Sequence, residues 1–161
     1  MYPEHAYEMV DNSCWPRSPS VVHCCAGPGG RNQRFGVQSY HSFSEDPTSN
    51  LGHAARAVIV SFSHDSPDVI IRFTPKNYPI SEIKPASEEE RLTLLAAFVA
   101  GNLDSQLVRG LKKDDAYAGD LQLIQTYRQL QKRNPRLRIL AVEKLAELES
   151  RGQLKEYLAS K

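Results

Sequence analysis

Helix start and stop signals follow one another through the part of the chain beyond Pro85. Ser87 followed by Glu90 has the spacing of a capping box, which predicts a helix from about Glu88 to Ala100. Gly101 would end this helix, because glycine readily adopts the left-handed conformation that follows a last helical turn. Such signals commit this half of the chain to helices whose apolar faces must be covered by another part of the protein.

Similar start and stop signals predict further helices toward the C-terminus. Proline is favoured at a first helical position because the N–H that it lacks would have no intrahelical partner there. Glycine is favoured just beyond a helix, which places the ends of two segments. The expected segments are a short helix near Asp104–Arg109 ended by Gly110, a helix from about Asp115 to Arg133, a long helix begun by Asn134-Pro135 and ended by Gly152, and a final turn over 153–159.

The N-terminal half reads differently, with many proline, glycine and serine residues and only short apolar runs. Ala57–Phe62 and Val69–Phe73 are rich in β-branched and aromatic residues, and a polar turn separates them. We interpret these two runs as a β-hairpin covered by helices on both faces. Ser20–His23 and Gly36–Phe43 are weaker candidates for strands.

The sequence therefore predicts an α+β fold in one domain, 1–161. A small, partly antiparallel sheet from the loop- and strand-rich half, 1–80, would pack against three to four helices from the helical half, 86–161. A hairpin alone is marginally stable in water, so the two halves are expected to fold together.

Charge and composition exclude some classes of function. The formal net charge of +1 creates no overall field that would draw the chain to nucleic acid or to an acidic membrane. The first residues lack a secretory signal, and the longest apolar run, Leu92–Ala100, is far shorter than the roughly 20 residues that span a bilayer. Three cysteines, an odd number, favour reduced thiols. We expect a cytoplasmic protein without a membrane partner.

All cysteines and histidines lie in the first 64 residues, and they gather near a glycine-rich stretch, Val21–Arg31. About ten residues here, running from Val21 to Gly29, resemble the start of the protein tyrosine phosphatase signature, His-Cys-x5-Arg. The resemblance implies a phosphoesterase in which a thiolate attacks phosphorus and an arginine clamps the phosphate. The match is incomplete: Arg31 falls one place late for Cys24, whereas Cys25 has the right spacing but no preceding histidine.

The phosphatase loop also runs into a helix, and residues 32–36 show no helical period. The alternative interpretation is a strand that ends in a glycine turn, with Cys24 as a small buried apolar residue. In either case no cofactor is implied.

Two other uses of these side chains are weaker. Cys14-Trp15 and the segment around His53 resemble the nucleophile and base of papain-like proteases, which implies a thiolate–imidazolium pair. Cysteine and histidine are also the preferred ligands of zinc. No closely spaced pair of such residues fixes two ligands locally, and we therefore predict no metal. The zinc ligands considered are Cys14, His23, Cys24 or Cys25, and His41 or His53.

A basic segment crosses the expected corner between the last two long helices, and it contains no acidic residue. It carries Arg128, Lys132, Arg133, Arg136 and Arg138. Such a corner could bind an acidic protein partner or the phosphates of nucleic acid, although no aromatic residues are interleaved for base stacking. Because every catalytic motif lacks a part, we favour a non-catalytic binding or regulatory protein with a protein partner. The alternative is a cysteine-dependent hydrolase using Cys24 or Cys25 with Arg31, or less favourably Cys14 with His53.

Overall fold

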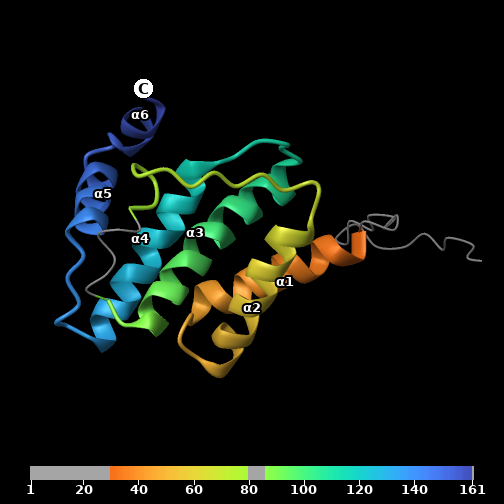
Figure 1. Cartoon of the computed structure of the whole chain (residues 1–161), viewed down its shortest axis with the longest axis horizontal. Coiled ribbons are helices and arrows are strands. Elements are labelled where there is room, and N and C mark those ends of the chain that lie inside the picture. The colour runs from red at the N-terminus through yellow and green to blue at the C-terminus, as the bar shows by residue number, and fades with distance from the viewer. Residues whose placement is uncertain (1–29, 80–85, 161) are drawn as a thin grey trace, which may run out of the picture.

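The protein is helical. The computed structural model describes residues 30–79 and 86–160, with side chains from residue 38 onward, and within these ranges it contains helices and no strand. The predicted α+β fold with an antiparallel sheet is therefore wrong for the part of the chain that is described. The helices are α1 (Gly30–Glu45), α2 (Asn50–Asp65), α3 (Glu88–Arg109), α4 (Ala116–Arg133), α5 (Leu140–Ser150) and α6 (Leu154–Ala159) (Figure 1).

The first half of the predicted hairpin, Ala57–Phe62, lies inside α2. This helix begins after Ser49, whose side chain accepts a hydrogen bond from the backbone N–H of Gly52 and so caps the first turn. Gly52, Ala55 and Ile59 are buried, and their spacing places them on one helical face. The β-branched composition of the run suggested a strand, but this helical spacing of the buried positions decides its conformation.

The second half of the predicted hairpin is extended but pairs with no strand. Residues 66–79, here called the strap, run from the end of α2 toward α6 (Figure 1). The N–H of Ile70 donates to the side-chain oxygen of Gln106 at 3.0 Å, and the Gln106 amide nitrogen donates to the Ile70 carbonyl at 2.8 Å. A side-chain amide on α3 thus provides the pairing that a second strand would provide. Of the weaker candidates, Gly36–Phe43 lies in α1, and Ser20–His23 lies outside the described residues.

Helix α3 begins as predicted but continues past its predicted end. Ser87 and Glu90 form the capping box, with side-chain to backbone distances of 3.2 and 2.8 Å. The helix then continues through Gly101 and ends at the left-handed Gly110, as expected for the second boundary. Gly101 is a crossing point: a Cβ atom there would lie 2.3 Å from the carbonyl oxygen of Ala118 on α4. The missing side chain lets two helix backbones approach closely.

Helix α4 matches its prediction, and its first turn is capped by Asp115. The following helix starts later than predicted, because Asn134 and Pro135 form a turn instead of a helix start. Ile139, the residue before α5, is fully buried and donates its N–H to the Tyr127 hydroxyl at 3.0 Å. Burying this segment in extended conformation delays the helix. The final turn contains the short helix α6.

Two clusters of buried side chains share α3 as their common wall. One lies among the strap, α3, α4, α5 and α6, and the other lies among α1, α2 and α3. Ile71 on the strap and Leu95 on α3 pack against both clusters, so the two are continuous. Prominent members of the first are Phe98, Leu123, Tyr127, Ile139 and Leu145, and of the second Phe43, Ile59, Ala97 and Ala100.

Candidate functional site

The basic residues predicted to form a binding surface lie at the C-terminal end of α4 and in its connection to α5. Three of these five cations pair with carboxylates on other parts of the protein. Two of the pairs tie α4, or the connection after it, to α5, and the third ties α4 to the turn before α2. The pairs are Arg128–Glu149, Arg133–Asp46 and Arg138–Glu143, at 3.1, 2.9 and 2.8 Å.

The remaining two cations, Lys132 and Arg136, are exposed and have no ion pair within the described residues. Leu140, at the start of α5, is also exposed, with 75% of its surface accessible. The corner is therefore less basic than its sequence suggests, but it retains two exposed cations without an ion pair in the described structure, and an exposed apolar side chain follows them in the chain. We call Lys132, Arg136 and Leu140 the corner surface.

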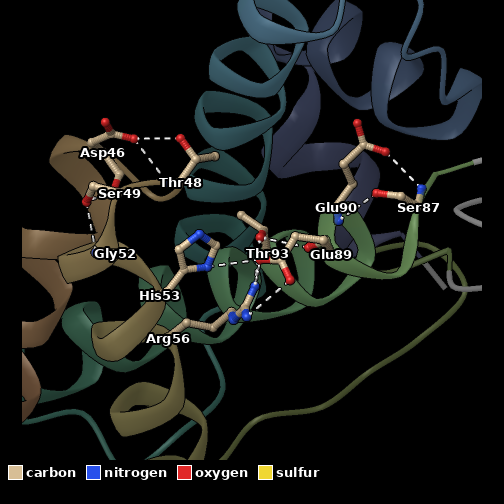
Figure 2. A network of polar contacts seen from close by, with 10 residues as sticks. All are labelled: Asp46, Thr48, Ser49, Gly52, His53, Arg56, Ser87, Glu89, Glu90 and Thr93. Atoms are coloured by element: carbon tan, nitrogen blue, oxygen red, sulfur yellow. Dashed lines mark hydrogen bonds and ion pairs between the residues drawn. The ribbon is translucent and has the colours of Figure 1, made fainter.

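The carboxylate of Asp46, which accepts a hydrogen bond from Arg133, belongs to a polar network around the start of α2 (Figure 2). Asp46 accepts hydrogen bonds from the hydroxyl of Thr48 at 2.8 Å and from its N–H at 3.0 Å. The hydroxyl hydrogen bond is the main cause that lowers the pKa of Asp46, and the Arg133 charge lowers it further. Asp46 is thus held as an anion by the turn itself, which makes it a fixed anchor for Arg133.

His53 lies in the same network, but its partner is a carboxylate on α3 (Figure 2). Its Nδ1 atom lies 3.0 Å from Oε1 of Glu89, and Arg56 donates to both oxygens of that carboxylate. The Arg56 hydrogen bond is the main cause that lowers the pKa of Glu89. Arg56 also donates to the hydroxyl of the buried Thr93 at 3.1 Å. This arrangement fastens α2 to α3, and Cys14, the predicted partner of His53, lies outside the described residues.

Most of the glycine-rich cysteine loop also lies outside the described residues. Cys24 and Cys25 are not among the described residues, and of Arg31 the structure gives only the backbone, in the first turn of α1. The expectation that residues 32–36 are not helical is wrong, since α1 begins at Gly30. Of the zinc candidates, His41 and His53 are described. Within the described ranges, no three histidine, cysteine or acidic side chains gather to hold a metal ion.

A groove of about 360 Å³ lies between α3 and α4, and Tyr40 of α1 forms part of its wall. Asp104 and Arg109 of α3 line it, as do Gln122 and Gln125 of α4. The Tyr40 hydroxyl donates to the side-chain oxygen of Gln122 at 3.2 Å. Sequence reasoning missed this groove because its residues come from three helices and form no local motif.

A partly buried polar cluster joins the strap to the start of α4. Asn102 donates to Asp114 at 2.6 Å, and Asp114 also accepts the N–H of Arg72 on the strap at 3.1 Å. Asp120, one turn into α4, is fully buried, and neither carboxylate oxygen has a hydrogen-bond partner. Burial, together with the nearby charge of Asp114, raises the pKa of Asp120 to about 8. Burying this unpaired acid lowers the stability of the fold.

Comparison with models of known protein families, with curated proteins and with solved structures finds no match to this chain. Among the helices in the described ranges, none combines the length and the hydrophobicity needed to cross a membrane.

Proposed function

We propose that this chain is a non-catalytic binding protein of the cytoplasm that takes an acidic segment of a partner protein on the corner surface. The observation that carries the proposal is the pair of exposed cations, Lys132 and Arg136, which have no carboxylate partner in the described part of the chain. Leu140, which is exposed, follows Arg138 and Ile139 in the chain. An acidic segment with an apolar side chain complements both features.

The surroundings favour a protein partner over nucleic acid. Single-stranded nucleic acids bind to aromatic platforms on which their bases stack. Residues 128–138 contain no aromatic side chain, and the preceding Tyr127 is buried with its hydroxyl occupied by Ile139 and Leu137. Exposed apolar and exposed charged side chains are instead the two components of protein interfaces, which combine an apolar centre with a polar rim.

Reversing both free charges, in Lys132→Glu with Arg136→Glu, is expected to weaken binding of an acidic peptide about tenfold or more. The probe is a fluorescein-labelled peptide of alternating glutamate and leucine, titrated by anisotropy at low and moderate salt. Because neither side chain holds an ion pair in the described structure, the variant should keep its helical circular dichroism and its melting temperature. The salt dependence of binding should also decrease, since fewer charges then meet the peptide.

The matched control is Arg72→Glu with Lys113→Glu, which changes the net charge equally at two exposed side chains, one on the strap and one between α3 and α4. Equal loss of peptide binding in both double variants would show a general charge effect and would refute the corner surface. A short single-stranded RNA serves as a second ligand. Tighter binding of this RNA than of the peptide, lost in the corner variant alone, would replace the protein partner with nucleic acid.

The second candidate is the cysteine-dependent hydrolase, favoured by the start of α1. A phosphatase-type loop runs into a helix, and Arg31 lies in the first turn of such a helix. This candidate predicts hydrolysis of an aryl phosphate that is abolished by serine at Cys24 or Cys25. It also predicts that the same thiol is alkylated rapidly near pH 6, because a nucleophilic cysteine has a lowered pKa. Slow alkylation of all three cysteines, with no turnover, would exclude it, and serine at Cys14 is the control.

A further inference from the structure

The groove between α3 and α4 carries opposite charges on one helix. Asp104 and Arg109 both line it from α3, and they are five residues apart in the chain. At 1.5 Å per residue their backbone positions are separated by roughly 7.5 Å along the helix axis. Its volume of about 360 Å³ falls in the range of small-molecule sites. A ligand lying along α3 would therefore meet an anion and a cation.

No compensating partner of Asp104 lies among the described residues. Its carboxylate makes no hydrogen bond or ion pair within the described residues, although the side chain is partly buried. Burial raises the pKa of Asp104, and the nearby His41 opposes this shift only in part. A partly desolvated carboxylate is stabilised by an incoming cation, so this end of the groove favours an ammonium group.

Arg109 retains donors for an anion. Its one ion pair in the described structure is a loose contact of 3.6 Å to Asp115, and 65% of its side chain is exposed. Asp115 is already occupied, since it caps α4 and accepts the Ser105 hydroxyl at 2.5 Å. Because a guanidinium has five N–H donors, Arg109 has several left for a carboxylate.

The rest of the groove suits a short aliphatic chain with some polarity. Val108 of α3 and Leu121 of α4 provide apolar wall, while Gln122 and Gln125 provide amide groups. From this arrangement we propose that the groove binds a small aliphatic zwitterion, with its ammonium group at Asp104 and its carboxylate at Arg109. The site lies apart from the corner surface and does not depend on it, so the failure of either proposal leaves the other standing.

The test titrates the isotope-labelled full chain with a series of unbranched zwitterions of increasing length: glycine, γ-aminobutyrate and ε-aminocaproate. The amide signals of Gly101, Gln122 and Gln125 report binding in the groove. We expect the longer zwitterions to shift these signals with Kd values near about 1 mM, the range of a weak ligand. The matched single ions, butylamine and butyrate, should bind at least about tenfold more weakly, because each uses only one of the two charges.

Two neutralising variants assign the contacts. Asp104→Asn and Arg109→Gln should each weaken zwitterion binding about tenfold, while Arg109→Gln leaves the weak binding of butylamine unchanged. Glu88→Gln, at the far end of α3, is the control and should bind as the unaltered protein does. The proposal is overturned if no zwitterion of the series shifts the groove signals, or if butylamine alone binds as well as γ-aminobutyrate. It is equally overturned if both neutralising variants keep full affinity while folded.

Discussion

Replacing Gly101 with alanine is expected to destabilise the protein by about 2–3 kcal/mol, although the same change in a helix interior normally stabilises by about 1 kcal/mol. The sign reverses because α3 and α4 cross at this residue. An added Cβ would lie 2.3 Å from the Ala118 carbonyl oxygen and 2.7 Å from the Gln122 Cβ atom. Backbone and Cβ atoms cannot move aside, so the helices must separate. Urea denaturation followed by circular dichroism measures the change in free energy of unfolding.

Gly110 provides the control for this prediction. It follows α3 as the left-handed C-cap residue, and nothing lies within 4 Å of a Cβ added there. Gly110→Ala should therefore cost only the backbone strain of about 1 kcal/mol. Gly101→Leu should be worse than Gly101→Ala and should abolish cooperative unfolding. A Gly101→Ala protein as stable as the unaltered chain, or more stable, would show that the two helices are not in close contact here.

The sequence predicted those helix boundaries that depend on neighbouring residues. Ser87 with Glu90, and Asp115 at the start of α4, cap helices through contacts within one turn, so their spacing alone identifies them. Gly101 is of the residue type that often ends a helix, but its role here is set by Ala118 on another helix. No pattern within α3 distinguishes a glycine that ends a helix from one that admits a second helix.

The predicted hairpin failed for a different reason. Ala57–Phe62 has the composition of a strand, yet only one of its residues, Ile59, is fully buried. Ser49 is a favoured N-cap residue and is a local signal for a helix that starts at Asn50, whereas the composition of the run indicates a strand. Val69–Phe73 forms no strand, and its pairing with Gln106 could not be foreseen, because a lone side chain takes the place of a second strand.

The sequence indicated which types of residue the candidate sites contain, but it did not show how those residues are arranged. The five basic residues are close in the sequence, but three of them are paired with Asp46, Glu143 and Glu149 in the structure. Asp46 lies 87 residues before its partner, and Glu149 lies 21 residues after its own, so the sequence could not show which cations have no ion pair in the described structure. The groove needed α1, α3 and α4 to be placed together before Asp104 and Arg109 could be related to a ligand.

Asp120 is expected to make the protein less stable as the pH rises through the neutral range. In the unfolded chain its carboxyl loses its proton near the ordinary pKa of 3.8, whereas burial and Asp114 raise the folded pKa to about 8. Between these values the folded state holds a proton that the unfolded state has released. The free energy of unfolding therefore falls with increasing pH, by up to about 1.4 kcal/mol per pH unit from this group.

Asp120→Asn removes this dependence, because the amide has the same shape and stays neutral at every pH. The variant should match the unaltered protein near pH 4 and exceed it by several kcal/mol at pH 8. Asp65→Asn is the control: Asp65 is exposed, and its hydrogen bond with His64 lowers its pKa, so its contribution is lost as the pH falls. That variant should keep the decline at neutral pH. Urea midpoints measured across this pH range test the prediction. Parallel curves for Asp120→Asn and the unaltered protein would contradict it, since they would mean that Asp120 is ionised in the folded state.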